Sequence, residues 1–154
     1  MSQIIEVIDV NVPLRTAYDQ WTQFETFPQF MEGVEQVTQV DDTTLIWRAR
    51  IAGMTREWEA KISEQTPDER IAWSSIDGAM NAGTVSFHAI DERRCRITLQ
   101  LDVDPGDPVE AVGDALGLVQ RQAVADLQNF KAFIEARGEE TGAWRGEVIG
   151  GSIR

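Results

Sequence analysis

Short alternating segments fill the middle of the chain, and they constrain its fold more than any other feature. From Val34 to Val103, apolar residues recur at every second position within segments that end at turn residues such as Gly53 and Asp91. An alternation with period two predicts antiparallel strands that bury one face. Together with a leading segment over residues 4–10, the pattern predicts seven strands.

A period of three and four residues follows the strands. Apolar residues recur at helical spacing from Val109 to Ile134, Asp107 and Pro108 predict the start of a helix, and Gly138 predicts its end. About thirty residues at 1.5 Å each give a helix of roughly 45 Å. We therefore expect one long C-terminal helix that crosses the whole sheet.

The stretch YDQWTQFETFPQF places an aromatic residue at every third position. Three residues fall about 60° short of a full helical turn, so one straight helix would wind these rings around all its sides. Pro13 and Pro28 instead favour two short helices, one after Pro13 and one from Pro28 to Gly33, with a bend between them. The bend would let both aromatic sets face the same interior. These aromatic residues are Tyr18, Trp21, Phe24, Phe27 and Phe30.

Composition favours one globular domain that works without metal or nucleic acid. The chain has 154 residues, which suits a single domain over residues 1–137 and a glycine-rich tail over residues 138–154. One cysteine and one histidine cannot build a disulfide framework or a zinc site. A net charge of −12 would repel a phosphate backbone. We expect no metal, no cofactor and no nucleic-acid partner.

The chain also carries no sign of membrane insertion or export. Its apolar runs are too short to span a bilayer, and its first ten residues lack the basic and apolar regions of a signal peptide. A cytoplasmic location without an integral membrane segment is the expectation.

This order of elements resembles the START-like (SRPBCC) superfamily, which includes the birch-pollen-allergen proteins, coenzyme Q-binding START proteins and bacterial polyketide cyclase/dehydrases. The resemblance rests on VPLRTAYDQWTQFETFPQFM, GAMNAGTVSFHAI, DPVEAVGDALGLVQRQAVADLQNFKAFIEARG and TGAWRGEV. It implies an α+β helix-grip fold, in which a seven-stranded curved antiparallel sheet wraps around a long C-terminal helix and two short helices follow the first strand. Fold alone does not fix activity.

The resemblance also implies an elongated apolar cavity between the sheet and the long helix. Gly113 and Gly117 fit either such space or a bend of the helix backbone, because glycine withholds the side chain that would fill a core. Core packing is the alternative interpretation for any single wall residue. The residues expected to line the cavity are Trp21, Phe27, Phe30, Met31, Trp47, Met54, Trp58, Trp73, Phe87, Leu116, Val119 and Gln120, with Phe27, Phe30 and Met31 at its entrance.

Three functions fit this interpretation. The first is binding or transport of a hydrophobic small molecule, such as a lipid, an isoprenoid quinone or a polyketide. The second is a polyketide cyclase/dehydrase that uses Arg56 and Ser75, although the inward arginine of that group is absent after Trp58, where Ala60 and Ile62 stand. The third is a filled domain that acts through surface contacts of the tail around Trp144. The sequence leaves the oligomeric state open.

Overall fold

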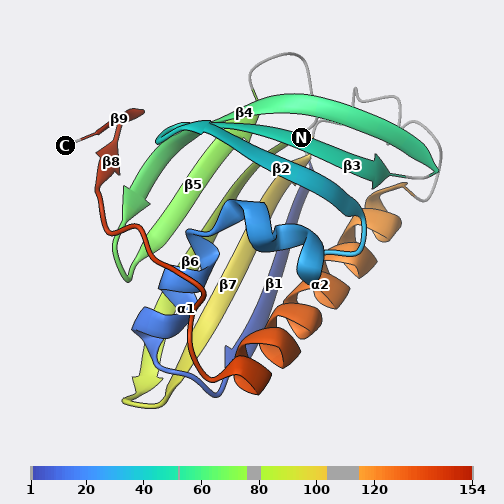
Figure 1. Ribbon diagram of the computed structural model, residues 1–154. Coiled ribbons are helices and arrows are strands. Elements are labelled where there is room, and N and C mark those ends of the chain that lie inside the picture. Colours follow the sequence, from blue (N-terminus) through green and yellow to red (C-terminus); the bar gives the residue numbers. More distant parts are fainter. Residues whose placement is uncertain (1, 52, 76–80, 104–114, 154) are drawn as a thin grey trace.

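A computed structural model describes residues 2–51, 53–75, 81–103 and 115–153 (Figure 1). The elements follow in the order β1 (Ser2–Val10), α1 (Leu14–Trp21), the 3-10 helix η1 (Phe24–Gln29), β2 (Val34–Asp41), β3 (Thr44–Ile51), β4 (Met54–Thr66), β5 (Arg70–Ser75), β6 (Asn81–Asp91), β7 (Arg94–Val103), α2 (Ala115–Arg137), β8 (Val148–Ile149) and β9 (Ser152–Ile153). The helix-grip fold predicted from the sequence is confirmed.

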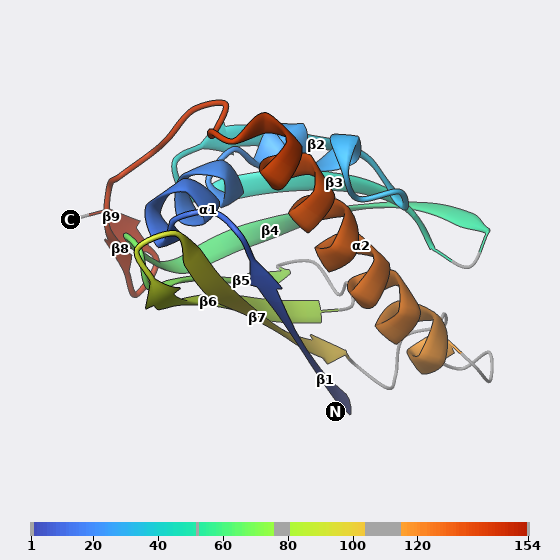
Figure 2. The same ribbon diagram turned by 90° about the horizontal axis from the view of Figure 1, so that it is seen from below.

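Among the described residues, nine strands form one antiparallel sheet: seven follow the order β1-β7-β6-β5-β4-β3-β2, β8 pairs with β4, and β9 pairs with β8. The alternation of the sequence matches its burial. On β7, Cys95, Ile97 and Leu99 are buried, and on β4 the residues Trp58, Ala60 and Ile62 are buried. The sheet curves around one side of α2, which runs diagonally across its concave face (Figures 1 and 2).

Helix α2 lies along the outer edge of β1 and covers part of that edge. The Lys131 ammonium donates a hydrogen bond of 3.0 Å to the backbone carbonyl of Asp9. The Asn11 backbone N–H donates one of 2.7 Å to the Glu135 carboxylate. An edge strand with free backbone groups invites pairing with another chain, so these side chains protect the sheet at this edge. The predicted start of the helix at Asp107 and Pro108 lies outside the described residues.

The second short helix differs from the prediction. It spans Phe24–Gln29 with Pro28 inside it, whereas the sequence predicted a helix from Pro28 to Gly33. In a 3-10 helix each N–H bonds to the carbonyl three residues earlier, and bonds of this kind run from Thr26 to Gln23 and from Phe30 to Phe27. Because the 3-10 helix has three residues per turn, side chains three apart lie on one face. The three-residue spacing of Phe24, Phe27 and Phe30 therefore matches this helix.

The chain after α2 packs back onto the domain as an ordered segment. We call residues 138–149 the C-terminal strap. It crosses α1 and ends in β8, which pairs with β4 through Gln65↔Val148 and Glu64↔Ile149. Gly150 and Gly151 then form the turn to β9 with φ angles of 61° and 81°, a left-handed conformation that glycine adopts without strain. The sequence had predicted neither of these two strands.

Candidate functional site

An aromatic cluster fills the interior between α1, η1, the sheet and α2. Trp21 is its centre, with ring centroids 5.7 Å from Phe27, 6.2 Å from Phe87 and 4.7 Å from Phe130. The short helices deliver four of its rings because α1 and η1 turn their aromatic residues to the same side, as the sequence predicted. The cluster consists of Tyr18, Trp21, Phe24, Phe27, Phe30, Trp47, Trp58, Phe87, Phe130 and Phe133.

Two tryptophans on neighbouring strands form a flat wall of this cluster. Trp47 on β3 and Trp58 on β4 are cross-strand partners, and their rings are parallel within 2° at a centroid distance of 6.1 Å. Both are buried, and the Phe27 ring lies 5.6 Å from Trp47. Among the described residues, the buried Trp47 indole nitrogen has no hydrogen-bond partner. The Trp47 nitrogen is therefore an unpaired donor within an otherwise aromatic cluster.

A third inward-facing tryptophan, Trp73, lies on β5. It stands opposite Gly83 on β6, and a Cβ atom at Gly83 would clash with the Trp73 ring. Glycine is therefore required here so that the indole can lie across the neighbouring strand. Trp73 is half-buried, as is Val119 on α2.

The structure places the remaining predicted residues in different environments. Phe30 and Met31 are buried, and Phe30 is in ring contact with Phe130. Met54 lies half exposed at the end of the β3–β4 hairpin. Gln120 is exposed and donates a hydrogen bond of 3.1 Å to Glu6 of β1, which directs its amide to the sheet edge.

Three other predicted positions are less defined. Arg56 and Ser75 are half-buried on the inward phase of β4 and β5. Leu116 belongs to the first turn of α2, and its side chain lies outside the described residues, as does Gly113. At Gly117 an added Cβ would meet no atom within 4 Å, so space is open beside this turn.

Asp126 is a candidate that the sequence analysis missed. Burial raises the pKa of its carboxyl to about 7, although the Gln122 amide donates a hydrogen bond of 2.7 Å to it. The nearby Glu32 charge raises the pKa further. A carboxyl that exchanges its proton near neutral pH suits acid–base chemistry. Its position one residue before the buried Leu127 was the available signal.

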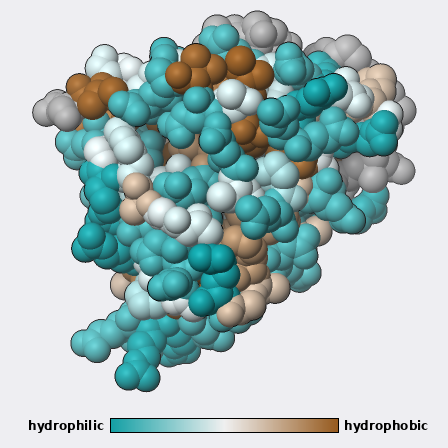
Figure 3. Space-filling view, in the orientation of Figure 1, coloured by the Kyte–Doolittle hydropathy of each residue, from teal (hydrophilic) through white to brown (hydrophobic). Residues whose placement is uncertain are grey.

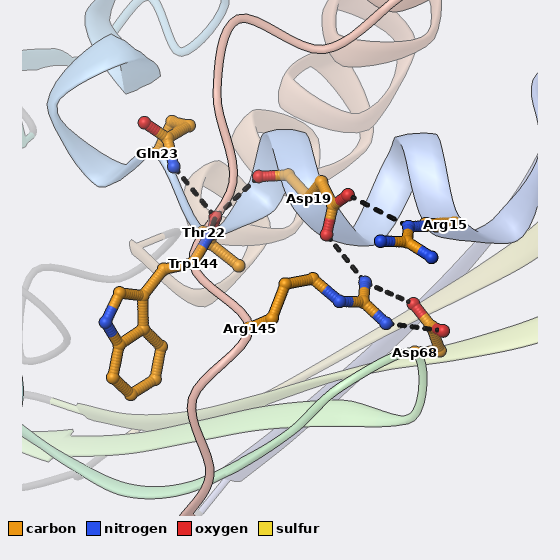
Figure 4. Close-up of polar contacts among 7 residues, drawn as sticks. All are labelled: Arg15, Asp19, Thr22, Gln23, Asp68, Trp144 and Arg145. Atoms are coloured by element: carbon orange, nitrogen blue, oxygen red, sulfur yellow. Dashed lines mark hydrogen bonds and ion pairs between the residues drawn. The ribbon is translucent and has the colours of Figure 1, made fainter.

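A second polar centre lies where the C-terminal strap crosses α1 (Figure 4). The Arg145 guanidinium donates one hydrogen bond of 2.7 Å to Asp19. It donates two more of 2.8 Å to Asp68, one to each carboxylate oxygen. The Asp19 side chain is only 3% exposed. The hydrogen bond from Arg145 holds the pKa of Asp68 below its usual value. We call these three residues the strap clamp.

The strap is held by neutral contacts as well. The buried Gln20 amide accepts a hydrogen bond of 2.8 Å from the Thr141 N–H and donates one of 3.1 Å to the Thr141 hydroxyl. The Trp144 backbone N–H donates a hydrogen bond of 3.1 Å to the Thr22 hydroxyl. The strap therefore fixes α1 over the aromatic cluster.

Neither centre resembles a metal site or a membrane anchor. Within the described ranges, no three histidine, cysteine or acidic side chains gather closely enough to bind a metal ion. No helix in the part of the chain that the structure describes has the length and apolarity needed to span a membrane.

Comparisons with known proteins agree with this architecture. Residues 10–132 match the family described as "Polyketide cyclase / dehydrase and lipid transport". An uncharacterized 17.2 kDa protein of Streptomyces lincolnensis, from the melC2-rnhH intergenic region, is 53% identical over 150 residues, which covers 97% of this chain and 100% of that protein.

Two solved structures show the same fold at low sequence identity. The Zhui aromatase/cyclase from Streptomyces sp. R1128 has a TM-score of 0.79 at 18% identity, covering 93% of this chain and 99% of that one. A START superfamily protein from Mycobacterium smegmatis has a TM-score of 0.67 at 17% identity, covering 88% and 95%. The match over residues 10–132 shows that the chain belongs to the polyketide cyclase/dehydrase and lipid transport family.

Proposed function

We infer that this protein binds a hydrophobic small molecule against the tryptophan wall of its sheet. The observation that carries this inference is the parallel stacked pair of Trp47 and Trp58, whose rings lie on the inner side of β3 and β4. Family membership supports it, since the family description includes lipid transport. Burial of apolar ligand area at roughly 25 cal/mol per Å² would supply the affinity.

Two apolar side chains, one on α2 and one on β5, keep partial exposure. Val119 and Trp73 are only half-buried, whereas Val85 of β6 is fully buried. Large apolar side chains that keep partial exposure are suited to contact a ligand. An isoprenoid quinone, a lipid and a polyketide all fit this description.

A substitution that fills space tests the inference. Val119→Phe should be tolerated without loss of stability if a hollow lies beside this residue, and it should lower the affinity for the neutral probe N-phenyl-1-naphthylamine at least tenfold. The same change at a packed position, Val85→Phe, should destabilise the fold by about 1–3 kcal/mol because the core has no room. Loss of stability in both variants, with no probe binding by the parent protein, would contradict the inference.

One observation favours the enzymatic alternative. Asp126 holds a carboxyl that titrates near neutral pH, and Arg56 and Ser75 lie on the inward phase of the sheet. A cyclase/dehydrase would use such groups to move protons during ring closure and dehydration. Turnover of a poly-ketone substrate that disappears in Asp126→Asn, with unchanged substrate affinity, would establish this function over simple binding.

The surface-interaction alternative receives less support. The strap is ordered against its own domain through Arg145 and Gln20. The face shown in Figure 3 is mainly hydrophilic, and its apolar side chains form small separate patches. Protein interfaces are usually built around a larger contiguous core.

A further inference from the structure

The Trp47 indole N–H is an unusual feature of the aromatic cluster. The residue is 9% exposed, and its buried Nε1 atom has no hydrogen-bond partner in the part of the chain that the structure describes. A buried donor left unpaired costs about 1–3 kcal/mol, so buried tryptophans usually find an acceptor. The fold therefore keeps an unfavourable group in the middle of β3.

The aromatic rings that contact Trp47 offer this donor no acceptor. The rings in contact with it are those of Phe27 and Trp58, and neither supplies a lone pair in an ordinary hydrogen-bonding position. Phenylalanine has no polar atom, and the indole nitrogen of tryptophan only donates. A small rotation within the described structure would therefore not pair the indole with these neighbours.

Two other buried side chains also lack a hydrogen bond, but their situation differs. The Tyr18 hydroxyl and the Gln65 amide have no partner at bonding geometry among the described residues. Gln65 lies close enough to Tyr18 to influence its pKa, so the two can pair with each other after a small movement. The rings that pack against Trp47 carry no acceptor, and an external acceptor would explain why its indole N–H is left unpaired.

We propose that the Trp47 indole N–H orients the ligand by donating a hydrogen bond to a carbonyl oxygen of a flat ring. This inference rests on the proposed binding function and narrows its ligand class. The parallel faces of Trp47 and Trp58 favour a planar ring system, because aromatic surfaces stack with offset parallel geometry. A saturated acyl chain would leave the donor unpaired, whereas a ring ketone or quinone satisfies it.

Two ligands of matched shape test the proposal. We would measure the affinities of 2,3-dimethyl-1,4-naphthoquinone and 2,3-dimethylnaphthalene for the protein and for Trp47→Phe by calorimetry. A net hydrogen bond of about 0.5–1.5 kcal/mol corresponds to a factor of about two to ten in affinity. Trp47→Phe should lower the affinity for the quinone by that factor more than it lowers the affinity for the hydrocarbon. Trp58→Phe is the matched control and should weaken both ligands equally.

A spectroscopic signature separates orientation from packing. In a ¹⁵N-correlated NMR spectrum, the indole N–H signal that Trp47→Phe removes should move downfield when the quinone binds to the parent protein, and should not do so with the hydrocarbon. An equal loss of affinity for both ligands in Trp47→Phe would overturn this proposal and leave the binding function intact. So would an indole signal that does not move when the quinone binds. Binding of neither ligand would contradict both.

Discussion

Removal of the Arg145 guanidinium is the perturbation with the clearest structural consequence. Arg145→Met keeps the apolar stem of the side chain and deletes the three hydrogen bonds of 2.7–2.8 Å to Asp19 and Asp68. The Asp19 carboxylate would then keep Arg15 as its remaining cation, at 3.7 Å, and that side chain is 70% exposed. Breaking a buried ion pair costs about 3–5 kcal/mol because one charge stays buried.

The position of Arg145 reduces this magnitude. Its own side chain is 31% exposed, so water can replace part of the lost interaction at Asp68. We expect Arg145→Met to lower the free energy of unfolding by about 2–4 kcal/mol. Arg94→Met is the matched control, because Arg94 also binds an aspartate, Asp91, with two hydrogen bonds, but both side chains are about half exposed. That control should lose at most about 1 kcal/mol.

Urea unfolding at neutral pH, followed by tryptophan fluorescence, measures both variants. The pH dependence gives a second readout. Since Arg145 holds the pKa of Asp68 below its unfolded value, this bond stabilises the fold above about pH 4 and loses its effect as the pH falls. The difference between the parent protein and Arg145→Met should therefore shrink in acid. Equal small losses for Arg145→Met and Arg94→Met would refute the description of the strap clamp as a buried ion pair.

Two further predictions concern the interior. Asp126→Asn should leave stability unchanged near pH 4 and raise it at pH 8, because a carboxyl whose folded pKa of about 7 lies above its unfolded value destabilises the fold progressively as the pH rises from about 4 to 7. The folded pKa of about 7 and the unfolded pKa of about 4 differ by about 3 pH units, which at about 1.36 kcal/mol per unit limits the gain in unfolding free energy to about 4 kcal/mol. Urea unfolding of both proteins at pH 4 and pH 8 measures this gain. The same stability difference at both pH values would show that the carboxyl is solvated. Gly83→Ala should destabilise the fold by about 1–3 kcal/mol and change the near-UV circular dichroism, because the new methyl group displaces the Trp73 ring. An unchanged spectrum and stability would show that Trp73 does not lie on β6.

The sequence predicted the strands and the main helix because each buries one face against the same core. Alternation placed Trp58 and Ile97 inward, and helical spacing placed Leu127 and Ile134 inward, as the structure confirms. These patterns are local and survive without knowledge of the partner element. The resemblance to START-like proteins predicted that the sheet wraps around the long helix.

The features that the sequence did not predict depend on long-range contacts. The C-terminal strap has no periodic pattern, and its order comes from Arg145 and Gln20 meeting groups more than seventy residues away. The raised pKa of Asp126 depends on burial that only the packed helix creates. The boundary of η1 was missed because a proline disfavours α-helical geometry at the residue before it, which predicts a helix that begins at Pro28, whereas the 3-10 helix contains both Phe27 and Pro28.

Native mass spectrometry of freshly purified protein tests the central claim most directly. The account predicts a population that carries a hydrophobic small molecule, released when the protein is denatured, and rebinding of a flat ring ketone or quinone by the emptied protein. A single mass equal to that of the chain alone, together with no uptake of aromatic or lipid ligands, would show that the tryptophan wall is only core.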